Sequence, residues 1–252
     1  MTRDPKALSD PSAIRRTGLV LGLTLVAGCT DAISYLGLGR VFTANMTGNT
    51  VLLGVAVAQR DAGAAGRSAA ALGGFLVGAT LVGLAPSPKS GLRSVTAPLI
   101  GEVALLAALL GWWIVAGSGP TGAVRDGLIA LAGTAMGVQS AAVARLGVPG
   151  VATTYITGTW TGITAGVATW LRQHPRVRRG RTGAVSQPAG DEDPKVKRGL
   201  QVAVVLIYLG GAIASGFARD AWGAAAASVP LGILACVLLA TALPPERGGL
   251  AA

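Results

Sequence analysis

Apolar runs of membrane-spanning length recur along the chain and are separated by short polar segments. At 1.5 Å per residue, a helix needs about 20 apolar residues to cross a hydrocarbon core of about 30 Å. The pattern predicts an all-α fold, a polytopic transmembrane helical bundle with eight membrane segments. The predicted segments are residues 17–38, 41–59, 68–85, 95–117, 127–145, 148–171, 199–218 and 222–243.

The second segment is unusually polar for a membrane helix. Residues 41–54 contain two amide and three hydroxyl side chains around Gly48: Thr43, Asn45, Thr47, Asn49 and Thr50. Polar groups in hydrocarbon are costly unless they find partners or face a cavity. Two interpretations remain open, namely a broken helix that lines a site and a close helix–helix contact through small and hydroxyl residues.

A second copy of this pattern indicates an internal repeat. Residues 151–166 are again rich in threonine and glycine. The alignment sets residues 46–49 on 156–159, Asp31 opposite Gln139, and Phe75 opposite Tyr208. We therefore expect two related halves, 17–117 and 127–243, with polar tails at 1–16 and 244–252. Internal repeats with interrupted helices at matching positions are common in transporters.

The number of membrane crossings has two solutions. If all eight segments span, the halves are parallel repeats; if the second and sixth dip in and out, six spans remain and the halves are inverted. Both arrangements put 16 of the 21 Lys and Arg residues on the side of the two termini, which the positive-inside rule assigns to the cytoplasm. We favour eight spans, because segments 41–59 and 148–171 are long and apolar at their C-terminal ends.

Composition excludes an ordinary soluble domain, since 51% of residues are hydrophobic and 13% are charged. The net charge of +10 lies mostly in connecting segments, above all in the basic loop 172–198. Contact with anionic lipid headgroups explains this charge better than nucleic acid does. Cys29 and Cys236 lie in apolar runs, so we expect two buried thiols without a disulfide. Together with the lone His174 they form no metal-ligand set, and no cofactor is expected.

Two carboxyl residues lie inside apolar segments and are candidates for function. With eight spans, Asp31 and Glu102 share a depth of about 10 Å below the outer surface. They are either a proton- or cation-coupling pair or hydrogen-bonded packing residues. Combined with the polar stretches, the predicted substrate-binding residues are Asp31, Asn45, Thr47, Asn49, Glu102, Gln139, Thr157 and Thr159. No catalytic motif is present, so enzyme activity is unsupported.

Two stretches carry a resemblance to a known family. Residues 31–36, Asp-Ala-Ile-Ser-Tyr-Leu, are followed by Val-Phe-Thr-Ala-Asn-Met-Thr-Gly-Asn-Thr-Val at 41–51, and Thr-Tyr-Ile-Thr-Gly-Thr-Trp-Thr follows at 154–161. Together they resemble the YoaK family of bacterial integral membrane proteins over about residues 17–243. The resemblance implies a bacterial inner-membrane location and no functional residues. The long basic loop departs from the family pattern.

The sequence thus predicts a small-solute transporter or permease with a polar site between two repeats. The solute is not identified by any motif, and copies of the chain could associate as a homo-oligomer. The alternative is a membrane-embedded enzyme or an accessory subunit of a membrane complex.

Overall fold

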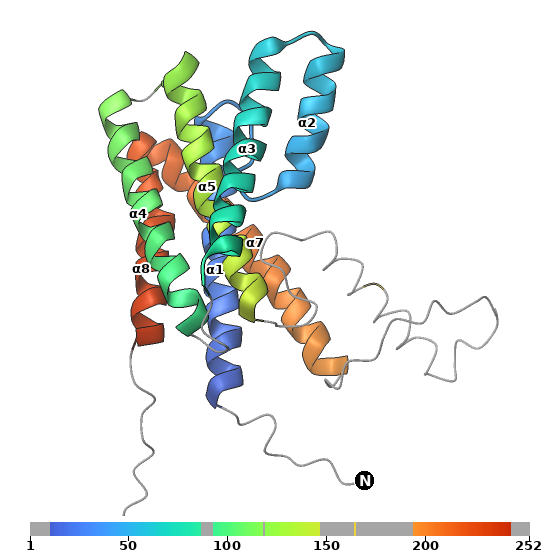
Figure 1. Cartoon of the computed structure of the whole chain (residues 1–252), viewed down its shortest axis with the longest axis vertical. Helices are drawn as coiled ribbons and strands as arrows, with labels where there is room; N and C mark the ends of the chain where they lie inside the picture. Colours follow the sequence, from blue (N-terminus) through green and yellow to red (C-terminus); the bar gives the residue numbers. More distant parts are fainter. Residues whose placement is uncertain (1–10, 87–92, 118, 147–163, 165–193, 243–252) are drawn as a thin grey trace, which may run out of the picture.

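The computed structural model describes residues 11–86, 93–117, 119–146, 164 and 194–242. Within these ranges the chain is helical with short turns, which confirms the predicted all-α class (Figure 1). The elements are α1 (Pro11–Gly37), α2 (Met46–Ala58), α3 (Ala62–Leu84), α4 (Arg93–Ala116), α5 (Gly122–Leu146), α7 (Pro194–Trp222), the 3₁₀ helix η3 (Gly223–Ala227) and α8 (Ser228–Ala242). The predicted segment 148–171, Thr157, Thr159 and most of the loop 172–198 lie outside the described residues.

Contacts at one end of the bundle fix the direction of five helices. The guanidinium of Arg67, in the second turn of α3, donates to the carbonyl oxygen of Gly39 just after α1, at 3.1 Å. A Cβ added at Gly39 would also lie 3.6 Å from Cδ of Arg125, at the start of α5. One added at Gly37 would meet both Trp113 near the end of α4 and Arg219 near the end of α7.

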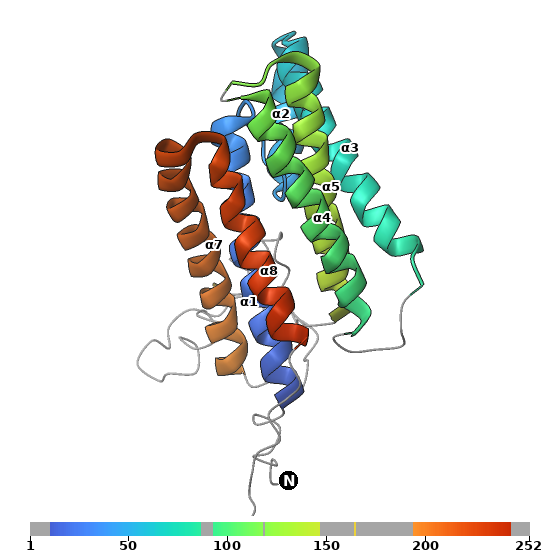
Figure 2. The same cartoon turned by 90° about the vertical axis from the view of Figure 1, so that its left-hand side faces the viewer.

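The opposite end is fixed in the same way. Arg15 of α1 donates to the carbonyl oxygen of Ala240 at 3.1 Å, and Arg145 of α5 donates to that of Ala85, just after α3, at 3.0 Å. Helices α1, α4 and α7 therefore run in one direction, and α3, α5 and α8 run in the other (Figures 1 and 2).

Helix α2 does not fit the prediction of eight spanning segments. It contains 13 residues, which is about 20 Å of helix against a hydrocarbon core of about 30 Å. The end of α1 and the start of α3 also lie at the same end of the bundle, so the chain between them returns to the side that it left. Eight spans are not confirmed, and α2 stands beside α3 at that end (Figure 1).

Helices α1, α3 and α4 of the first half pack mainly on helices of the second half, whereas α2 packs on α3. Helix α1 lies on α7 and α8, α3 lies on α5, and α4 lies on α5 and α8 (Figure 2). Glycines allow α3 to lie close to α5 and α1 to lie close to α7. A Cβ added at Gly78 would be 2.0 Å from the carbonyl oxygen of Thr134, and a Cβ added at Gly28 would be 2.2 Å from the carbonyl oxygen of Tyr208. Small residues at such positions let helix backbones meet in a membrane.

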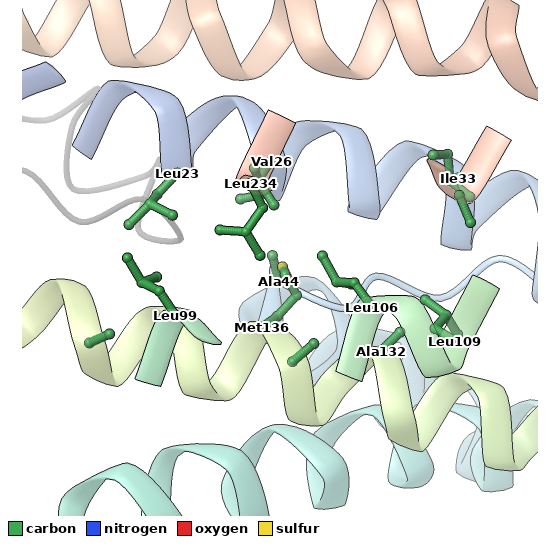
Figure 3. Packing of buried hydrophobic residues seen from close by; sticks show 14 of the residues in the cluster. Leu23, Val26, Ile33, Ala44, Leu99, Leu106, Leu109, Ala132, Met136 and Leu234 are labelled. Carbon is green, nitrogen blue, oxygen red and sulfur yellow. The ribbon is translucent and has the colours of Figure 1, made fainter. Parts of the chain in front are cut away.

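The hydrophobic core lies between α1, α4, α5 and α8. Leu23 and Leu234 face Leu99, Leu106 and Met136 across it (Figure 3). Within the described residues, five apolar helical stretches are long enough to cross a membrane. The last of them, Gly199–Ala240, covers the α7–η3–α8 hairpin seen in Figure 2.

The cysteine prediction is correct for one thiol only. Cys29 is buried, and its thiol contacts the carbonyl oxygen of Gly211 at 3.5 Å. Cys236 is exposed, because it lies on the outer side of α8 rather than on the side that packs against α1 and α4. Both are free cysteines.

Candidate functional site

Asp31 holds the segment that follows α1 against the bundle. Its side chain is buried, and Oδ1 accepts hydrogen bonds from the backbone N–H groups of Thr43 at 2.7 Å and Ala44 at 2.6 Å. The hydroxyl of Tyr208 on α7 donates to Oδ2. One carboxyl group therefore joins α1, the 38–45 loop and a helix that lies 177 residues further along the chain.

The loop reverses the chain through two residues in the left-handed region. Gly39 has a φ of +93° and Arg40 a φ of +61°, and these residues break the helix at the end of α1. The chain then turns back along α1, where the hydroxyls of Ser34 and Thr43 lie 3.2 Å apart. The 38–45 loop therefore ends beside Asp31 rather than at the end of α1.

Two asparagines shape the start of α2. Asn45 is its N-cap, and its side-chain oxygen accepts from the N–H of Gly48 at 3.1 Å. The amide of Asn49 accepts from the N–H of Phe42 at 3.0 Å and donates to the carbonyl oxygen of the same residue at 2.5 Å. Both predicted residues thus satisfy backbone groups that helical hydrogen bonds leave open, which matters most where water is excluded.

The loop lies well inside the end of the bundle. Asp31 precedes Gly37, the last residue of α1, by six residues, which corresponds to about 9 Å of helix. Non-helical backbone at such a depth is tolerated where protein groups satisfy it or where it lines a cavity. Protein groups satisfy this loop, because Asp31 accepts from the N–H groups of Thr43 and Ala44 and the amide of Asn49 binds the N–H and the carbonyl oxygen of Phe42.

Glu102 and Gln139 belong to a different part of the core. Glu102 on α4 is fully buried, and neither carboxyl oxygen has a hydrogen-bond partner among the described residues. Gln139 on α5 is also fully buried; its Nε2 donates to the carbonyl oxygen of Leu23 at 2.9 Å, while Oε1 has no partner in the same part of the chain.

The predicted site residues therefore fall into two groups. Asp31, Asn45 and Asn49 come together at the 38–45 loop, and Glu102 and Gln139 lie in the core beside α4 and α5. Thr47 is exposed in the first turn of α2. Tyr208 was missed as a site residue, although a tyrosine hydroxyl in an apolar run needs a partner and is a signal in itself.

The arrangement assigns different chemistry to the two carboxyl groups. Both oxygens of Asp31 are occupied by donors, which suits a group that positions the loop. Glu102 has no such donors and no cation beside it in the described part of the chain. No cluster of three His, Cys, Asp or Glu side chains that could hold a metal ion occurs among the described residues.

These features define a multi-pass helical membrane protein in which the chain turns back inside the bundle after its first helix. The chain belongs to the family described as "Protein of unknown function (DUF1275)", which matches residues 19–240. It is 37% identical over 151 residues to the UPF0700 transmembrane protein YoaK of Bacillus subtilis (strain 168). That alignment covers 59% of this chain and 65% of the relative, just under two thirds of its length. No solved structure matches the chain. The resemblance to the YoaK family is thus confirmed.

Proposed function

We propose that the protein is a small-solute transporter or permease of the bacterial inner membrane, with six spans and a re-entrant segment formed by the 38–45 loop and α2. The observation that carries this proposal is the loop itself, a stretch of non-helical backbone held about 9 Å inside the bundle by Asp31. Broken segments of this kind form the binding sites of many transporters, where they lie at the interface between repeats.

Helix contacts support the internal repeat on which this proposal depends. A Cβ at Gly28 would meet the carbonyl oxygen of Tyr208, and one at Gly137 would meet that of Phe75. The same relation links Gly211 with Leu25 and Gly78 with Thr134. In each case, the first helix of one half meets the third helix of the other half through equivalent positions.

This equivalence supports inverted repeats, because α1 and α5 run in opposite directions. It sets Gly28 opposite Gly137 and therefore Asp31 opposite Ser140, one residue along from the Gln139 that the sequence alignment chose. In this register Ser140 is equivalent to Asp31, and Phe75 is equivalent to Tyr208. The hydrogen bond between Asp31 and Tyr208 therefore has no counterpart in the other half.

Cysteine accessibility tests the topology. In a background without Cys29 and Cys236, single cysteines at positions 40, 62 and 119 should all react with an impermeant maleimide from the side opposite the N-terminal tail. All three positions lie at the same end of the bundle, and Leu84→Cys at the other end serves as the control. Labelling of position 62 from the side of the tail would contradict the re-entrant arrangement.

Uptake into proteoliposomes tests the transport function. We expect at least one radiolabelled solute from a panel of amino acids, sugars and organic acids to accumulate above the level in empty liposomes. Thr47→Val should reduce this uptake several-fold, because Thr47 is exposed beside the loop and its hydroxyl is available to a solute. Thr50→Val is the matched control, since the Thr50 hydroxyl donates to the carbonyl oxygen of Met46 at 2.9 Å. Equal uptake by the two variants would contradict a solute path at this loop.

A further inference from the structure

Glu102 lies in the middle of the buried face of α4. The other members of this face are apolar and almost completely buried, and they recur every three or four residues: Val95, Leu99, Leu106, Leu109 and Trp113. Leu99 and Leu106 are the neighbours of Glu102 on this face, and Figure 3 shows Leu99 pointing toward Leu23 and Leu106 pointing toward Met136 and Leu234. The carboxyl group of Glu102 therefore occupies a position where the pattern calls for a hydrophobic side chain.

Among the residues that the structure describes, no charged group from the neighbouring elements compensates Glu102. Helix α4 packs on α5, α8 and η3. The charged residues of α5 are Arg125 and Asp126 in its first two turns and Arg145 in its last turn, so the middle of the helix has none. Helix α8 and η3 contain no Asp, Glu, Lys, Arg or His, and the one titratable residue of α8, Cys236, is exposed.

Gln139 on α5 carries a further buried acceptor. Because Nε2 of Gln139 is already bound to Leu23, the group left without a partner is its carbonyl oxygen. The core thus contains three buried acceptors that have no donor among the described residues, namely Oε1 and Oε2 of Glu102 and Oε1 of Gln139.

From the complete burial of Glu102 and its lack of a partner or a compensating charge, we propose that its carboxyl group is a proton-binding site and is neutral in the folded protein. A carboxylate carries a full charge and only accepts hydrogen bonds, whereas a protonated carboxyl group is neutral and supplies an O–H donor. An uncompensated charge inside the membrane is costly and marks proton relays in pumps and transporters. The inference rests on the proposed transport function, to which it adds the coupling ion.

Asp31 does not share this role. Its two oxygens accept from two backbone N–H groups and one hydroxyl, so a carboxylate is stabilised there without a proton. From the sequence, Asp31 and Glu102 are either a coupling pair or hydrogen-bonded packing residues, and the structure gives hydrogen-bond partners to Asp31 alone. Asp31 is therefore the matched control for Glu102.

Infrared spectroscopy of the purified protein in lipid tests the proposal without a transport assay. The difference spectrum between the wild type and Glu102→Gln should show the loss of a protonated carboxyl C=O band, whereas Asp31→Asn should leave this band in place. The proposal is overturned if no protonated carboxyl band is lost in Glu102→Gln. It is also overturned if the band appears only when Na⁺ is omitted, because that result would assign the site to a cation.

Dicyclohexylcarbodiimide provides an independent test, since it adds to protonated carboxyl groups in apolar surroundings. Peptide mass spectrometry should find the adduct on Glu102 in the wild type, declining as the pH is raised, and no adduct on Asp31. Labelling of Asp31 but not Glu102 would overturn the proposal.

If uptake is measured, Glu102→Gln should lose accumulation driven by a pH gradient while retaining exchange. Absence of any uptake together with a positive infrared result would instead contradict the transport function alone.

Discussion

Replacement of Asp31 by alanine is expected to lower the free energy of unfolding by about 3 kcal/mol, because it leaves three donors without an acceptor. Each buried donor that loses its partner costs about 1–3 kcal/mol, and hydrogen bonds to charged groups are at the upper end of the usual range. Two of these donors are the backbone N–H groups of Thr43 and Ala44, so the variant should also release the 38–45 loop. Denaturation in detergent measures the first effect, and faster hydrogen exchange at residues 43 and 44 measures the second.

Two further variants at the same carboxyl group provide the controls. Tyr208→Phe removes one donor and should cost about 1 kcal/mol, with little effect on exchange in the loop. Asp31→Asn retains one oxygen for the two N–H groups and should lie between the other two variants. If Asp31→Ala is no less stable than Tyr208→Phe, the loop is held by other contacts and the role assigned to Asp31 is wrong.

Gly78→Ala should also be strongly destabilising, by about 3 kcal/mol. The new Cβ would lie 2.0 Å from the carbonyl oxygen of Thr134 and 2.9 Å from the backbone nitrogen of Val138, so the backbones of α3 and α5 must move apart. Overpacking of a core contact usually costs about 1–3 kcal/mol, and here a whole helix must shift rather than one side chain. The same denaturation measurement gives the value.

Gly73→Ala is the matched control on the same helix, because nothing lies within 4 Å of a Cβ added there. It should cause no loss of stability, since alanine is the better helix former. Equal destabilisation by the two changes would show that the contact between α3 and α5 tolerates a methyl group. The packing register inferred from these glycines would then lose its support.

The positions of the helices could be read from the apolar runs, whereas their lengths could not. A run of about 20 apolar residues sets the length that crosses the membrane, and polar residues can continue a helix beyond it. Helix α1 therefore begins at Pro11, before the predicted start at residue 17. Helix α7 begins at Pro194, inside the predicted loop 172–198, with proline at its first position as is common in helices.

The path of the second segment could not be decided from the sequence. The basic residues divide equally well in the eight-span and six-span arrangements, and the apolar C-terminal part of the segment favours a crossing. The path of this segment is set instead by hydrogen bonds between residues that are apart in the sequence. Arg67 binds Gly39, and Asp31 binds the N–H groups of Thr43 and Ala44. No periodicity marks these pairs. The polar stretch itself was a sufficient signal that this segment differs from the others.

The candidate site was predicted in part for the same reason. Asp31, Asn45 and Asn49 stand out as polar residues in an apolar region, and all three make the hydrogen bonds that bend the chain. Their roles depend on partners, and the partner on α7 is far away in the sequence. Tyr208 entered the sequence alignment only as the counterpart of Phe75, although its hydroxyl in an apolar run indicates a buried partner.

The packing of each early helix on later ones has a consequence for biosynthesis. Helices α3 and α4 find their main partner α5 only after residue 146 has been made, and α1 must wait for α7 and α8. During translation α1, α3 and α4 are therefore made before the helices that cover their glycine faces and the side chain of Glu102. The nascent chain would need to be shielded by the insertion machinery until its last hairpin emerges. Ribosome-bound chains that stop before α7 should accordingly be the form most readily captured by membrane chaperones and most rapidly degraded.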